Sequence, residues 1–323
     1  MTGEVVYVTS FRQLELPERL RGDVRLLPFI NITNDSAVRA RLLTDEFSHF
    51  AGAIELGHLR AAPNLVFGEL GASEMGGLPP DRFLVMLLLW IGGLFDNAWL
   101  LKDHAMRCEG AYLTHRPVGG RATWTSNFLP TRPSLADGTV DHTITMSADE
   151  LKAWSQKNAH VESYLHDADS GRFRFMMQKG FARSGRAMRF VKAARSAPDL
   201  AFKIAHYCGA LETLLTTENA ELAHKLSERS ALLLGRRGYD RLTVFRTVKK
   251  AYGVRSKLVH GDTLQARQVE ELPSIAVRLD EYLRTILNAI FESDSLQRVF
   301  DSPGEAIEEY FTELLFGDPM KDA

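Results

Sequence analysis

Cysteine is scarce in this chain, and no long apolar run occurs in it. The two cysteines, Cys108 and Cys208, are far apart in a chain of 323 residues. Their separation fits no zinc-binding pattern and predicts no disulfide framework, so free thiols in a reducing compartment are expected. The longest apolar run, at 83–95, is too short to span a bilayer and predicts a buried helix.

An excess of one charge is also lacking, since the formal net charge is −2. Contents of 45% hydrophobic and 25% charged residues are those of an ordinary globular protein. The N-terminus, MTGEVVYVTSFRQ, has no apolar core of a signal peptide. Neither metal-ligand spacing nor a phosphate-loop pattern is found. We therefore predict a cytoplasmic protein with no membrane segment, no bound metal and no cofactor.

The chain length predicts two domains, and the element pattern makes the protein α+β overall. A mixed α/β domain is expected at 1–146 and an all-helical domain at 147–323. Alternating and helical hydrophobic periods, with Gly and Pro between them, define the elements of the first domain. They are strands at 5–10, 24–32, 110–115 and 139–146, helices at 40–59 and 81–103, and loops at 68–80 and 116–146.

The second domain begins with a capping box, in which Ser147 caps a helix and Glu150 reaches back to the Ser147 amide. Charge is segregated within this domain. Residues 171–195 contain eight Lys or Arg and no acid, including Arg172, whereas 262–323 is acidic. The predicted helices are at 148–166, 173–195, 199–216, 220–234, 241–259, 268–292 and 303–315.

Phe173 and other phenylalanines are interleaved with the basic residues of 171–195. Such a run can track phosphates while the rings stack on bases, and we select Arg186 and Arg189 as candidate RNA contacts. The alternative is a solvated helix face whose phenylalanines lie in the core.

Arg255 and His260 form an R-x4-H pair at the end of the helix predicted over 241–259. With 28 Arg and 10 His, about one such pair is expected by chance, so the pattern alone carries no weight. Its surroundings are more informative. Gly261 is placed to end the helix, and the negative helix terminus favours a protonated histidine. An ideal helix rotates about 140° over five residues, so two copies meeting in a dimer would complete one site.

Three segments carry a family resemblance. ALETLL with Glu212 comes first, then KLSER with Lys225, Glu228 and Arg229, and then AYGVRSKLVHG with Tyr252, Arg255, Ser256 and His260. Their order and spacing resemble the HEPN domain of the Apea-like family. The resemblance covers about 200–290, and the helices at 147–195 fit the usual lead-in to such a domain.

The resemblance implies a dimeric helical bundle that cuts RNA without metal. Attack by the 2′-OH would leave a 2′,3′-cyclic phosphate, with His260 transferring protons and Arg255 stabilising the charge. Ser256, Glu212 and Tyr252 would support them, and Lys249, Lys250 and Lys257 would contact RNA.

Such proteins act in antiphage defence or as toxins, often with an antitoxin or another defence partner. The alternative function is a non-catalytic module that binds RNA or a protein in a defence complex. In that case Arg255 would pair with Glu212 or Glu228 inside the bundle.

Overall fold

A computed structural model describes residues 3–168, 170–171, 174–217, 220–302 and 304–317. Helices hold 57% of the residues and strands 13%, so the chain is α+β, as predicted. Contacts divide it into two units. The first contains the chain up to Pro133 together with Val140–Ala159, and the second contains Ser134–Thr139 and the chain from His160 onward. The sequence-based prediction places the division after residue 146; in the structure helix α5 (Ala148–Asp167) contributes to both units.

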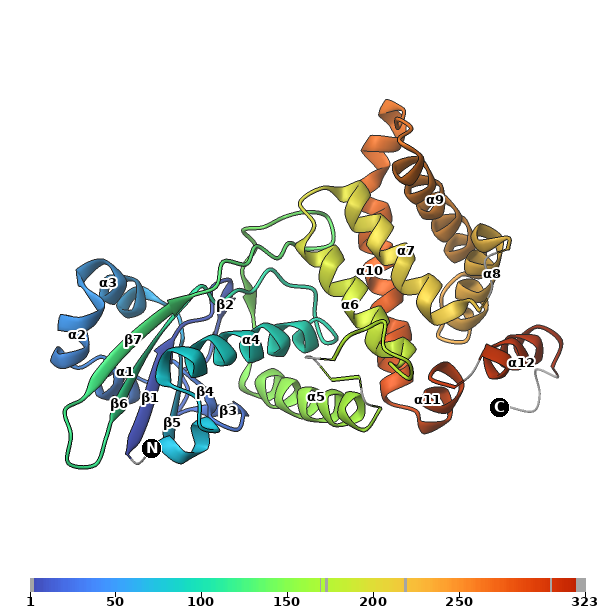
Figure 1. Cartoon of the computed structure of the whole chain (residues 1–323). Coiled ribbons are helices and arrows are strands. Elements are labelled where there is room, and N and C mark those ends of the chain that lie inside the picture. Colours follow the sequence, from blue (N-terminus) through green and yellow to red (C-terminus); the bar gives the residue numbers. More distant parts are fainter. Residues whose placement is uncertain (1–2, 169, 172–173, 218–219, 303, 318–323) are drawn as a thin grey trace. The chain divides into compact units, whose positions relative to one another are not determined.

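The first unit is built on a six-stranded sheet (Figure 1). The strand order is β3-β4-β5-β1-β6-β7, and all neighbouring strands are antiparallel. The strands are β1 (Glu4–Thr9), β3 (Val24–Leu27), β4 (Ile30–Thr33), β5 (Leu65–Gly71), β6 (Gly110–Arg116) and β7 (Thr123–Phe128). A separate two-stranded parallel pair joins β2 (Leu14–Glu15) to β8 (Ile144–Thr145).

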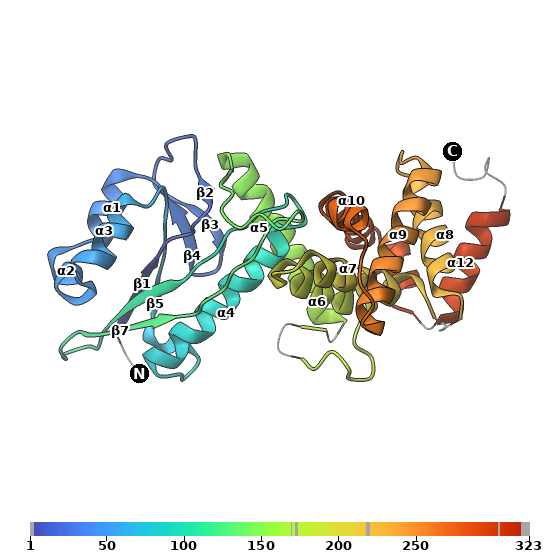
Figure 2. The same ribbon diagram turned by 90° about the horizontal axis from the view of Figure 1, so that it is seen from above.

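Helices cover both faces of this sheet, as Figure 2 shows. On one face lie the short helices α1 (Ser36–Leu42), α2 (Asp45–Ala51) and α3 (Ala53–Ala61); on the other lies α4 (Pro80–Ala98). Alternation along β1 supplies both cores, because successive side chains of a strand point to opposite faces. Val5 and Tyr7 pack in the core with α4, and Val8 packs in the core with α1–α3. The start of α5 joins the α4 side, where the Trp154 indole donates to the Leu94 carbonyl at 2.9 Å.

Several predicted elements of this unit were wrong. The single strand at 24–32 is a hairpin of β3 and β4, with Phe29 at a φ of 67° in the turn. The single helix at 40–59 is three short helices. Part of the predicted loop at 68–80 belongs to β5, and the predicted loop at 116–146 contains β7. Gly68 is required within a strand, because a Cβ there would lie 2.0 Å from the Phe29 carbonyl oxygen.

The second unit is a helical bundle whose buried side chains come mainly from α7, α8, α9 and α10. Its helices are α6 (Arg183–Ser196), α7 (Leu200–Leu215), α8 (Leu222–Gly235), α9 (Arg241–His260), α10 (Ala266–Phe291), α11 (Asp294–Phe300) and α12 (Gly304–Phe316). The end of α5 packs here, where the His160 ring lies 2.5 Å from the Phe291 carbonyl oxygen. Within the described part of the chain, no helix has the length and apolar character needed to cross a membrane.

The helix predictions for this unit hold well, with two exceptions. The predicted capping box is present at the start of α5, in the part of that helix that belongs to the first unit, with Ser147 and Glu150 exchanging hydrogen bonds of 2.9 and 3.2 Å. The helix predicted at 173–195 begins only at Arg183, after a series of turns, and α11 was not predicted. Arg172 and Phe173 lie outside the described residues.

Candidate functional site at the end of helix α9

Helix α9 is fixed at both ends by its own sequence. The Asp240 carboxylate accepts from the Thr243 amide at 2.8 Å, which caps the N-terminus. Gly261, with a φ of 75°, adopts the left-handed conformation that ends many helices. Val248, Ala251 and Val254 lie on the buried face between these ends. The register of this face determines that Arg255 turns partly toward the bundle and His260 toward solvent.

Arg255 is paired with Glu212 of the neighbouring helix α7. The Arg255 Nη2 atom lies 3.4 Å from Glu212 Oε1, and the two side chains are only 29% and 21% exposed. The guanidinium also lies over the Tyr252 ring, 5.3 Å from its centroid. A cation in that position is attracted by the face of the ring. Arg255 is therefore held from two sides in a fixed orientation.

The surroundings of this pair are poorly hydrated. Burial raises the pKa of Glu212, and the Arg255 charge offsets only part of this effect. Burial likewise raises the pKa of Cys208, which lies one turn before Glu212 on α7. Glu212 Oε1 is buried without a hydrogen bond of normal geometry. Because electrostatic interactions are stronger where water is excluded, a charge that reaches Arg255 would interact with it strongly.

The structure separates the two motif residues. His260 lies in the last turn of α9 and is exposed, whereas Arg255 is half-buried against α7. Ser256 follows Arg255 and is also half-buried. The five-residue spacing turns the helix by about 140°, which explains why the chain presents the arginine and the histidine in different directions.

The three lysines predicted to contact RNA lie along α9, and two of them contact α10. Lys250 pairs with Glu271 at 2.8 Å, and the Lys257 ammonium donates to the Gln268 side chain at 2.9 Å. The Lys249 ammonium lies 5.9 Å from the centroid of its helical neighbour Phe245. Lys249 thus extends along the exposed surface of α9, whereas Lys250 and Lys257 help to join α9 to α10.

Arg186 and Arg189 lie on α6, and their contacts run to the preceding segment. Arg186 Nε donates to the Met176 carbonyl at 3.2 Å, and Arg189 Nη2 donates to the Gly171 and Arg174 carbonyls at 3.4 Å. The Arg189 guanidinium also lies 5.9 Å from the centroid of Phe181. These contacts place the two arginines against the chain between α5 and α6, not beside the residues of α9.

A depression beside Tyr252 adds a residue that sequence reasoning missed. It is lined by Tyr252 and by the start of α8, including His224, whose ring meets that of Phe245 edge-on at 5.6 Å. His224 lies next to Lys225, the first residue of the KLSER motif, so the motif could have indicated it. The motif residue Arg229 is structural: it contacts the Leu215 carbonyl and Glu308, and so holds α12 to α8.

Comparison of the chain with protein-family models, with curated proteins and with solved structures gives no match. The resemblance to the HEPN domain therefore rests on the three segments in helices α7, α8 and α9. These segments do meet in space, because α7 contacts α8 and both contact α9. Membership of the family stays a prediction.

Proposed function

We propose that the protein is a homodimeric endoribonuclease that cleaves RNA without a metal ion. The observation that carries this proposal is on α9, where a clamped arginine lies one and a half turns before an exposed histidine. An oriented guanidinium and an accessible imidazole are the two groups that phosphodiester transesterification requires. The local motifs and the basic character of α9 agree with an RNA substrate.

In the proposed reaction the RNA 2′-oxygen attacks the adjacent phosphorus atom while the bond to the 5′-oxygen breaks. His260 of one protomer accepts the 2′-OH proton, and a second copy of His260 donates a proton to the leaving 5′-oxygen. The products are a 2′,3′-cyclic phosphate and a free 5′-OH. Arg255 stabilises the negative charge that develops on the phosphoryl oxygens, since a preorganised cation does this without rearranging during the reaction.

The remaining residues support these two groups. Glu212 and Tyr252 orient the guanidinium of Arg255, and Ser256 assists by donating a hydrogen bond to the RNA. Lys249 follows the RNA backbone along α9. In this proposal Arg186 and Arg189 contact the RNA only if the chain between α5 and α6, to which they are hydrogen-bonded, lies along the RNA strand that is bound at α9.

The test is RNA cleavage in the presence of EDTA by the full chain and by variants. His260→Ala and Arg255→Ala are expected to reduce the rate by at least a hundredfold, which is typical for loss of a general base or a charge-stabilising group. His166→Ala is a matched control, because His166 is also an exposed histidine in the last turn of a helix. Arg246→Ala is the second control, on the opposite side of α9 from Arg255. Equal activity in all five proteins would refute the proposal.

The second candidate is a module that binds RNA or a protein without cutting, within a defence complex or with an antitoxin. It is favoured by the contacts of Arg255, Lys250 and Lys257, each of which already has a partner within the chain. The same variants separate the two functions when RNA binding is measured beside cleavage. Binding without cleavage in the unaltered protein, whether EDTA or Mg²⁺ is present, would favour this candidate.

A further inference from the structure

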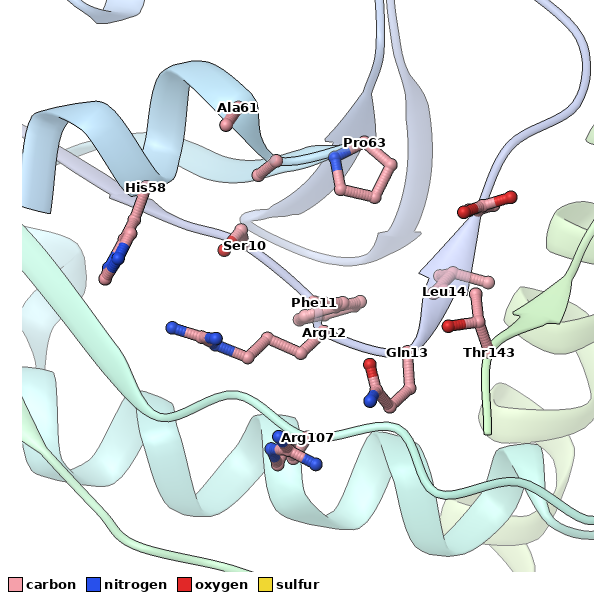
Figure 3. Close-up of a pocket in the computed structure, with 12 residues that line it drawn as sticks. Ser10, Phe11, Arg12, Gln13, Leu14, His58, Ala61, Pro63, Arg107 and Thr143 are labelled. Atoms are coloured by element: carbon pink, nitrogen blue, oxygen red, sulfur yellow. The ribbon is translucent and has the colours of Figure 1, made fainter. Parts of the chain in front are cut away.

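The first unit contains a pocket that neither the sequence motifs nor the proposed nuclease site explains. It has a volume of about 380 Å³, within the range of small-molecule sites. Its wall is formed by residues 10–15, by the end of helix α3 around His58, and by Arg107 and Thr143. In Figure 3, His58 and the guanidinium of Arg12 lie on the left of the pocket, and Leu14 and Thr143 lie on the right. We propose that this pocket binds a small phosphorylated molecule through Arg12 and Arg107.

One carboxylate holds the two arginines. Arg12 Nε lies 2.9 Å from Glu109 Oε2, and Arg107 Nε lies 3.0 Å from Glu109 Oε1. Each guanidinium is thus anchored through Nε, which leaves the Nη groups of Arg12 and Nη2 of Arg107 for another acceptor, while Arg107 Nη1 lies 3.6 Å from Asp141 Oδ1. The backbones of Arg12 and Arg107 also pair with each other, at 2.9 and 3.3 Å. Two guanidiniums fixed side by side match the several oxygens of a phosphate group.

The charge balance favours an anion at these arginines. The two guanidiniums and Glu109 together carry one net positive charge. Two further carboxylates, Glu15 of the pocket wall and Asp141 beside Arg107, oppose an anion, but both are exposed (Asp141 to 75%), so solvent screens their charges. Within the described part of the chain, no three His, Cys, Asp or Glu side chains are grouped to hold a metal ion. The arginine pair is therefore better suited to an oxyanion than to a cation.

The pocket wall at residues 11–14 is held rigidly by Asn64, which is fully buried. The Asn64 side chain accepts from the Phe11 amide at 2.9 Å and donates to the Phe11 and Leu14 carbonyls at 2.9 and 2.8 Å. Gln13 lies between them at a φ of 62°, a conformation that is unfavourable for residues other than Gly. Such conformations persist where the surroundings enforce them, and they cluster at functional sites. A fixed wall reduces the entropy lost when a ligand binds.

The remaining pocket groups suit the rest of such a molecule. Ser10, Gln13 and Thr143 provide hydroxyl and amide groups for a polar ligand, and His58 can donate to a phosphate oxygen. All of these residues belong to the first unit. The proposal therefore stands independently of RNA cleavage by the second unit.

Titration calorimetry with the full chain tests the proposal, using inorganic phosphate, adenosine monophosphate, adenosine and citrate. We expect binding of at least one phosphate-containing probe, and binding at least tenfold weaker for adenosine and citrate. Arg12→Gln should weaken phosphate binding about tenfold or more, because it removes a charged hydrogen-bond donor. Arg121→Gln is the matched control, since Arg121 is an exposed arginine of the β6–β7 turn.

Arg12 is preferred to Arg107 for this substitution because it is the more exposed of the two, at 46% against 17%. His58→Ala is the second variant, on an exposed helix position, and should weaken phosphate binding without loss of fold. Two results would overturn the proposal. One is no heat from either phosphate probe up to about 10 mM; the other is binding that Arg12→Gln and His58→Ala leave unchanged.

Discussion

The pair of Arg255 and Glu212 leads to a prediction about stability that bears on every activity assay of this site. Arg255→Ala removes the guanidinium and leaves the Glu212 carboxylate in a half-buried place beside buried Cys208. The carboxylate then has no cation to offset the loss of hydration. We expect the variant to fold, and its free energy of unfolding at pH 7 to fall by about 1–3 kcal/mol.

Two bounds give this magnitude. At 3.4 Å and an effective dielectric constant of about 20, the direct attraction is about 5 kcal/mol, most of which the loss of hydration offsets. The second bound comes from protonation. An unpaired Glu212 can become neutral, which costs at pH 7 at most about 4 kcal/mol relative to an ordinary glutamate pKa of about 4.3. The loss cannot exceed this value through the carboxylate alone.

The loss should depend on pH in a defined direction. Without Arg255 the pKa of Glu212 in the folded state rises further, so the folded state binds a proton more tightly than the unfolded state. Its contribution to stability is then fully present below the unfolded pKa and is lost as pH rises through the folded pKa. The difference between Arg255→Ala and the unaltered protein should therefore shrink as pH falls from 7 toward about 4.5.

Urea denaturation at a series of pH values measures this difference. Glu212→Gln in the Arg255→Ala background removes the titrating group, so the double variant should be more stable at pH 7 than Arg255→Ala alone. A loss that is constant with pH, or a double variant no more stable than the single one, would refute the reasoning. RNA cleavage by Glu212→Gln then shows whether Glu212 takes part in the reaction or only positions Arg255. Retained activity identifies Glu212 as a positioning residue of modest effect.

Two further predictions concern the helical unit. Burial raises the pKa of Asp301 to about 6, although its carboxylate accepts hydrogen bonds from the Ser184 amide and hydroxyl. The protonated form of Asp301 therefore contributes to the stability of the fold below the unfolded pKa, and this contribution is lost as pH rises through about 6. Asp301→Asn should therefore remove about 2 kcal/mol of the fall in unfolding free energy between pH 4 and pH 7, as urea denaturation would measure, and an unchanged slope would contradict the assignment. If the nuclease site needs His260 of both protomers, adding an excess of inactive His260→Ala protein to the unaltered protein under exchange should lower the cleavage rate, whereas an unchanged rate would show that each chain acts alone.

The helical half could be predicted from sequence because its signals are local. Ser147 and Glu150 are three residues apart, and the bonds they form depend on the first turn of one helix alone. Asp240 and Gly261 mark the ends of α9 for the same reason. The missed helix α11 has seven residues, too few for a hydrophobic period to be visible.

The sheet was harder to predict because the residues that determine its strands are distant from one another in sequence. Gly68 looks like loop punctuation, yet it lies in β5, where Tyr7 of β1 and the Phe29 carbonyl of the β3–β4 turn approach too closely for a side chain. Strand β7 lies in a segment rich in Gly, Pro, Ser and Thr, and its residues are only partly buried. Its pairing with β6 outweighs this composition.

The candidate site was likewise predictable where its signals are local in sequence, and not where they depend on contacts between distant residues. The sequence left Arg255 free to pair with Glu212 or Glu228, and the packing of α7 against α9 brings Glu212 to it. The pocket arginines, Arg12 and Arg107, were not singled out, because no motif joins residues so far apart in sequence. Only the fold brings them to the same carboxylate.

Because Arg255 and His260 of one chain point in different directions, the proposed reaction depends on the oligomeric state. Transesterification needs one group to accept a proton and another to donate one. Near Arg255, Glu212 is engaged in the ion pair, and on α9 only His260 of the motif faces solvent. A second copy of His260 supplies the missing group if two α9 helices meet near their C-termini, and the same meeting places both Arg255 side chains beside one phosphate. His224 lines the depression beside Tyr252, so loss of activity on mixing with excess His260→Ala protein distinguishes a shared site from one completed by His224 within a single chain.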